Sequence, residues 1–189
     1  RERLDQNPSF ISANQRTGNI TPAFVMEKIR NYDLVHYAGH ADYDTADPSN
    51  SGWILDGGKF TSADIIKLIG GRPMPALVFC NACQSGQTQE WRLGTGYNQK
   101  IFGLANAFLL AGVQHYLGTF WEILDEPGAD FAVAFYTAMS QGAPIGEAVR
   151  QARHALIRQY GEDTIVWASY MLYGDPSFSY FDFQEEAIE

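Results

Sequence analysis

The stretch DLVHYAG, residues 33–39, is a short apolar run that leads directly into His40. A second run, PALVFC at residues 75–80, ends shortly before Cys83. Apolar runs of this length predict buried strands of a parallel sheet. Because helical patterns alternate with such strands along the chain, the sequence predicts an α/β fold with a mostly parallel, doubly wound sheet and helices on both faces.

Local signals predict the remaining elements. Thr21 and Pro22 are typical N-cap and first-turn residues for a helix over residues 21–31. A polar loop then leads to a hairpin that turns on DGG, residues 56–58. Further helices are predicted at residues 61–71, 101–112, 129–142 and 144–160, a further strand at 113–121, and a final strand and turn at 170–178. In the last helix five apolar residues share one face: Ile145, Ala148, Val149, Ala152 and Leu156.

Length and composition indicate one globular domain over residues 1–189, with a core at about 20–180. The net charge of −9 and the lack of a Lys/Arg cluster argue against nucleic-acid binding and favour a basic partner or substrate. No apolar run reaches membrane-spanning length and no secretory signal is visible. Two closely spaced cysteines fit a reduced, cytoplasmic setting better than a disulfide. Because the chain does not begin with Met, we expect it to be a fragment of a larger protein.

Three reactive or polar segments follow predicted strands of this sheet. His40 follows the first strand, Cys83 follows the second, and residues 121–125 follow the strand that starts near Val113. Functional groups gather beyond the carboxyl ends of parallel strands, so these segments are expected along one edge. An imidazole that takes the proton of a thiol, or stabilises its thiolate, makes the sulfur a nucleophile. The placement therefore favours a His40/Cys83 pair.

Other interpretations of these residues remain open on spacing alone. A single His after a strand is commonly a polar loop residue, and a single Cys is commonly a small buried apolar residue. His36 lies inside its strand and is expected to pack or hydrogen-bond structurally, while Cys80 is expected to fill the core. His115 and His154 fall within patterned elements and are assigned no chemistry.

A metal or redox site also competes with the catalytic pair. His36-x₃-His40 and Cys80-x₂-Cys83 have the spacings of zinc ligands, but the four side chains would have to converge from two strands and their turns. A redox Cys-x-x-Cys motif usually opens a helix with its first Cys exposed. Here the first Cys ends a strand, and QSGQTQ after the second is a poor helix start.

Several blocks resemble the CHAT domain, a caspase-like cysteine peptidase module often attached to TPR repeats. They are LVHYAGHADYD (34–44), ALVFCNACQSG (76–86), the segment 103–157 with its Trp-x₃-Asp block, and YGDPSF (173–178). The resemblance covers roughly residues 20–180 and extends to caspases and separase. It implies that His40 is the catalytic imidazole and Cys83 the nucleophile, with no metal or organic cofactor. The family often has Gly where this chain has Ala41, but a methyl group leaves the backbone N–H in place.

The resemblance implies a thiol protease, a hydrolase that cleaves a protein substrate through a thioester on Cys83. The backbone N–H of Cys83 and an amide near Gly39 or Ala41 would form the oxyanion hole. The alternative is a catalytically silent interaction module with the same fold. An activating partner, or a TPR-type region of the same protein, is the expected regulator. The loop at residues 84–100 is expected either to become ordered on activation or to be an ordinary surface loop.

The Trp-x₃-Asp block is similar to a separase region that supplies an acidic pocket for arginine. It implies that Asp125 binds a P1 Arg, with Trp121, Glu122 and Glu126 as neighbouring substrate-binding residues. The alternative is that Asp125 caps the following helix.

Overall fold

The structure is a computed structural model that describes residues 12–44, 46–83, 97–121 and 123–181. In this part of the chain six strands form one mixed sheet in the order β3-β2-β1-β4-β5-β6. The central strands are parallel, and the strands toward both edges are antiparallel to their neighbours. The strand bounds are β1 Leu34–Asp42, β2 Gly52–Leu55, β3 Gly58–Thr61, β4 Leu77–Cys83, β5 His115–Thr119 and β6 Tyr170–Tyr173. The predicted α/β fold is confirmed.

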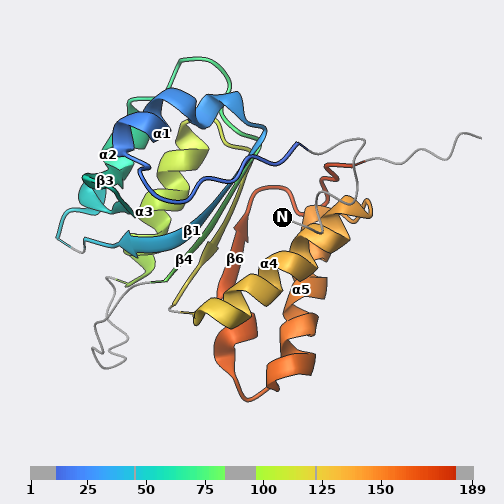
Figure 1. Ribbon diagram of the computed structural model, residues 1–189. Helices are drawn as coiled ribbons and strands as arrows, with labels where there is room; N and C mark the ends of the chain where they lie inside the picture. The colour runs from blue at the N-terminus through green and yellow to red at the C-terminus, as the bar shows by residue number, and fades with distance from the viewer. Residues whose placement is uncertain (1–11, 45, 84–96, 122, 182–189) are drawn as a thin grey trace, which may run out of the picture.

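Helices cover both faces of this sheet (Figure 1). One face carries α1 Pro22–Lys28, α2 Ser62–Ile66 and α3 Tyr97–Leu110; the other carries α4 Asp125–Ser140 and α5 Ile145–Tyr160. Short 3-10 turns lie at Ile29–Asn31, Pro48–Asn50 and Ile165–Ala168. Thr21 caps α1, as predicted, through its side-chain oxygen. Helix α3 begins at Tyr97, earlier than the predicted residue 101.

The antiparallel direction of the strands toward both edges of the sheet follows from the connections between elements. Strands β2 and β3 are joined by a turn at residues 56–57, within the predicted DGG turn at 56–58, and two strands linked so tightly can only run antiparallel. Strand β6 follows a pair of helices, α4 and α5, joined by residues 141–144. A short connection makes the two helices antiparallel, so the chain returns to the end of the sheet at which β5 ends. It therefore enters β6 in the direction opposite to β5.

The core has two parts, one on each side of the sheet. Between the sheet and α1–α3 the largest buried side chains include Trp53, Phe60 and Phe108. On the other side an aromatic cluster packs under α4 and α5: Phe79, Phe131, Phe135 and Tyr170. All five residues of the predicted apolar face of α5 belong to this second part and are buried.

Strand β1 is covered unequally on its two faces. Tyr37 and Ala41 pack toward α1–α3, and Ala41 is 2% exposed. The alternate residues His36, Ala38 and His40 are exposed, although the ring of His36 lies 5.6 Å from the ring of Tyr136 in α4. We call these three residues the open strip of β1.

The strands that carry the candidate site are longer than predicted. The sequence places the strand ends at residues 39 and 80, whereas β1 continues to Asp42 and β4 to Cys83. His40 and Cys83 therefore lie within strands, not in turns after them. The reason is pairing across strands: β1 gains β2 as a neighbour at Ala41, and β4 stays paired with β1 up to Cys83.

Candidate active site

The two central strands place His40 and Cys83 side by side. They are partners in the parallel register of β1 and β4, at the carboxyl ends of both strands. Neighbouring strands lie about 4.8 Å apart, which is close enough for side chains on adjacent strands to contact each other. This is the edge of the sheet where functional groups are expected, and His40 is exposed there.

The Tyr37 hydroxyl holds the main chain at His40 from the face of β1 opposite to the His40 side chain. The Tyr37 hydroxyl lies 2.7 Å from the carbonyl oxygen of His40 and 2.9 Å from that of Ile54. Its ring stacks on Trp53 with the centroids 4.4 Å apart, and the indole N–H of Trp53 donates to the Cys80 sulfur at 3.1 Å. Burial raises the pKa of Tyr37 to about 12, so the hydroxyl remains a donor at neutral pH.

The competing zinc site is excluded because successive side chains of β1 and of β4 point to opposite faces of the sheet. His36 stacks on Phe79 with ring centroids 4.4 Å apart, on the side of α4 and α5. Cys80 is 1% exposed and packs with Trp53 on the other side of the sheet. Side chains on opposite faces cannot bind one ion. Among the residues that the structure describes, no group of three or more His, Cys, Asp or Glu could hold a metal ion.

The same observations decide the roles of the remaining histidines and of Cys80. The structural role predicted for His36 and the core position predicted for Cys80 are confirmed. Because Cys80 is buried, it lacks the exposure of the first Cys in a redox motif. His115 is buried and joins β5 to the C-terminal segment, with its ring nitrogens 2.7 Å from the Tyr180 hydroxyl and 3.0 Å from the Asp175 carbonyl oxygen. His154 is exposed on α5.

A polar bridge joins the end of β4 to α4 and β6. The Asn81 side chain donates to the carbonyl oxygen of Gly128 at 3.1 Å and accepts from the Tyr170 hydroxyl at 3.2 Å. Next to it, the Thr119 hydroxyl donates to the carbonyl oxygen of Ala82 at 3.0 Å. These bonds position the residues just before Cys83. The sequence analysis missed them, because their partners are far apart along the chain.

The predicted substrate-binding segment lies at the start of α4. Asp125 and Glu126 are exposed residues of its first turn. The N-cap is Leu124, whose side chain has no hydrogen-bonding group, so Asp125 lies inside the helix and does not cap it. Trp121 is half-buried with its ring edge-on to Phe120 at 5.5 Å. Glu122 lies outside the described residues.

The predicted oxyanion-hole residues of β1 flank His40. Gly39 is in register with Ala82, and Ala41 pairs with Trp53 of β2. Both are therefore part of the strand and not of a flexible turn. The predicted activation loop at residues 84–100 lies mostly outside the described residues, and its last four residues form the first turn of α3.

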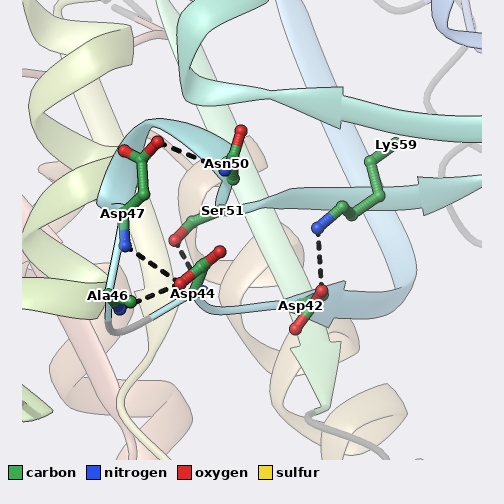
Figure 2. A network of polar contacts seen from close by, with 7 residues as sticks. All are labelled: Asp42, Asp44, Ala46, Asp47, Asn50, Ser51 and Lys59. Atoms are coloured by element: carbon green, nitrogen blue, oxygen red, sulfur yellow. Dashed lines mark hydrogen bonds and ion pairs between the residues drawn. The ribbon is translucent and has the colours of Figure 1, made fainter.

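The loop that follows β1 is held by its own polar groups (Figure 2). Asp44 accepts from the backbone N–H groups of Ala46 and Asp47 at 2.9 and 3.0 Å, and Ser51 accepts from the N–H of Asp44. These backbone bonds, that from Asp47 first, hold the pKa of Asp44 below its ordinary value. The carboxylate of Asp44 therefore serves to shape the loop that follows β1.

The family model named CHAT domain matches residues 6–175, which is nearly the whole chain. This protein belongs to the CHAT domain family. No curated protein matches the chain. In the described residues of this CHAT domain, no helix is both long and apolar enough to cross a membrane.

A solved structure gives the fold independently. The chain is similar to the crystal structure of the Arg-specific cysteine proteinase gingipain R (RGPB), with a TM-score of 0.62 and 16% identity. The match covers 85% of this CHAT domain and 36% of the gingipain chain. This neighbour confirms the caspase-like α/β fold.

Proposed function

We propose that this CHAT domain is a cysteine endopeptidase with Cys83 as nucleophile and His40 as proton carrier. The observation that carries the proposal is the register of His40 with Cys83 at the carboxyl ends of two central parallel strands. Strand neighbours in register share a face of the sheet, so the proposal expects the thiol on the side of the exposed imidazole. A substrate can reach His40 there, because Ala38 and His40 are exposed on this face of β1.

The reaction needs only groups of this chain and water. The Cys83 thiolate attacks the scissile carbonyl carbon, and the negative oxygen that forms is bound by the Cys83 backbone N–H and an amide near Gly39 or Ala41. When the intermediate collapses, the C–N bond breaks and the His40 imidazolium gives its proton to the leaving amine. Neutral His40 then takes a proton from water. The resulting hydroxide cleaves the thioester, which releases the carboxylic acid and restores the Cys83 thiolate beside the His40 imidazolium.

Substitution of the two proposed catalytic residues tests this function. Cleavage of a peptide library should fall at least about 10³-fold in Cys83→Ala and in His40→Ala, because each removes one half of a working pair. His36→Ala is the matched control, since it removes the other histidine on this face of β1 and should retain activity. Unchanged cleavage in Cys83→Ala would overturn the assignment.

A labelling experiment separates the peptidase from the silent interaction module. An iodoacetamide probe should react with Cys83 much faster when His40 is present, because the imidazole favours the thiolate. Cys80→Ala should leave this labelling unchanged, since Cys80 is buried in the core. Labelling that is slow and independent of His40 would favour the interaction module.

We further propose a preference for a basic P1 residue, with Asp125 as the main carboxylate and Trp121, Glu122 and Glu126 beside it. The first turn of α4, where Asp125 and Glu126 are exposed, is joined to β4 by the bond from Asn81 to Gly128. The net charge of −9 also favours a basic substrate. The gingipain with the similar fold is described as Arg-specific, which is in keeping with this preference.

The P1 preference is tested by the ratio of Arg to Leu cleavage. Because Asp125 is exposed, its ion pair with a P1 Arg should contribute about 1 kcal/mol, so Asp125→Ala should lower the ratio roughly fivefold. Glu126→Ala shows whether Glu126 shares the role of Asp125. Asp163→Ala is the control, because it removes an exposed acid elsewhere, after α5. A profile dominated by uncharged or acidic P1 residues would contradict the proposal.

A further inference from the structure

The ladder between β1 and β2 ends before it reaches His40. Its pairs are Ala41 with Trp53 and Asp42 with Gly52, so the next pair would be His40 with Ile54. The carbonyl oxygens of these two residues instead lie 2.7 and 2.9 Å from the Tyr37 hydroxyl. Backbone carbonyls that leave a ladder need another partner. The single hydroxyl proton of Tyr37 serves both oxygens at the point where the two strands separate.

The path of the Tyr37 side chain depends on a glycine and a tryptophan. The phenol lies along its own strand above Gly39, where an added Cβ would come within 2.7 Å of the hydroxyl oxygen. The ring is parallel to the Trp53 indole within 13°, and Trp53 is itself 2% exposed. Trp53 is anchored in turn by its bond to the Cys80 sulfur of β4. The position of the hydroxyl is therefore set by packing that does not involve the exposed face.

We infer that Tyr37 is a positioning residue for His40. It holds the peptide group that carries the imidazole, and so it sets the direction in which His40 leaves β1 toward Cys83. A fixed imidazole speeds proton transfer without adding a contact to substrate. Loss of the Tyr37 hydroxyl should therefore lower kcat and leave KM nearly unchanged. The inference rests on the proposed function for the kinetic effect, but the hold on His40 is a property of the fold.

The chain offers a matched control for the loss of this hydroxyl. Tyr116 in β5 has the same Tyr-x-Gly arrangement, in which an added Cβ at Gly118 would lie 2.7 Å from the Tyr116 ring. Tyr116 is buried on the same side of the sheet as Tyr37, but its strand does not carry His40. Both Tyr→Phe substitutions keep the ring and remove one oxygen.

The experiment compares Tyr37→Phe, Tyr116→Phe and His40→Ala in the intact chain. Tyr37→Phe should lower kcat about tenfold with KM within twofold, whereas Tyr116→Phe should lower kcat less than twofold. The His40 imidazole resonances, followed by NMR, should shift and broaden in Tyr37→Phe and stay unchanged in Tyr116→Phe. Gly39→Ala should reproduce the NMR change, because its methyl group displaces the hydroxyl.

The outcomes separate this inference from the proposed function. Equal kcat values and equal His40 resonances in the two Tyr→Phe variants would overturn the positioning role. Full activity in His40→Ala would overturn the proposed function, while a His40 resonance change limited to Tyr37→Phe and Gly39→Ala would still support the positioning role.

Discussion

The two faces of β1 differ in how they surround His40. On the side of α1–α3, Tyr37 stacks on Trp53, and its hydroxyl donates to the carbonyl oxygen of His40. On the side of α4 and α5, the open strip of His36, Ala38 and His40 is exposed. The difference shows how a strand can keep a reactive side chain accessible and still hold it rigidly, because the restraint acts from the covered face.

Strand β4 contrasts with β1 because it is covered on both sides. Phe79 packs under α4 and α5, and Cys80 packs against Trp53. A strand buried on both faces has few ways to move, so β4 supplies a stable backbone for Cys83. Substitutions on the two strands should therefore have very different effects on stability.

Removal of the Phe79 ring should have the largest effect on stability. The ring is fully buried and lies edge-on to Phe131 and Tyr170, with centroids 6.0 Å apart in both pairs. Phe79→Ala should lower the free energy of unfolding by about 3–5 kcal/mol, as measured by urea denaturation. Ala38→Ser on the open strip should change it by less than about 0.5 kcal/mol. A similar loss at both positions would show that β1 is as covered as β4.

Removal of the Asn81 amide should come next. Asn81→Ala leaves the Tyr170 hydroxyl and the Gly128 carbonyl without this partner, and should cost about 2–3 kcal/mol of unfolding free energy. Tyr170→Phe breaks one of the two bonds and should cost about 1 kcal/mol. If Asn81→Ala costs no more than Tyr170→Phe, the bond to Gly128 contributes nothing to the junction of β4 and α4.

Loss of the Thr119 hydroxyl should have a smaller effect. Thr119→Val keeps the side-chain shape but removes the bond to the Ala82 carbonyl beside Cys83, which should cost about 1 kcal/mol in thermal or urea unfolding. Thr137→Val is the control, because Thr137 also donates to a backbone carbonyl but lies exposed on α4. Its effect should stay within about 0.5 kcal/mol. Equal effects would argue that burial beside β4 adds nothing to the Thr119 bond.

The smallest expected effect is a pH dependence from His36. Part of its side chain is exposed, but burial of the ring lowers the pKa of His36 from 6.5 to about 4. The folded state thus favours neutral His36, and this contribution is complete above pH 6.5 and lost as the pH falls toward 4. Solvent contact should keep the loss below about 1 kcal/mol.

This pH effect is measured as a difference between two proteins. Urea unfolding at pH 7 and pH 4.5 should show a larger loss of stability for the unchanged protein than for His36→Gln, since carboxylates contribute equally to both. Identical pH dependence would show that the ring of His36 is as well solvated in the folded state as in the unfolded chain.

The sequence predicts the elements whose signals are local. The cap at Thr21, the hairpin turn at residues 56–57 and the buried face of α5 each depend on neighbours within one or two turns of chain. The placement of His40 and Cys83 at one edge of the sheet follows from the order of strands and helices, because parallel strands end at the same edge. The strand ends were predicted too early, since cross-strand pairing extends both strands.

The sequence by itself thus determined the fold class, the CHAT blocks and the two candidate catalytic residues, because these depend on residue type and spacing. Only the tertiary structure decided what supports them. Tyr37 reaches Ile54 across 17 residues, and Asn81 reaches Tyr170 across 89. Only the structure, too, separated His36 from Cys80 and left Ala38 and His40 exposed on one side of β1. Contacts of this kind form when distant segments pack together, and no local pattern in the chain specifies which polar group meets which.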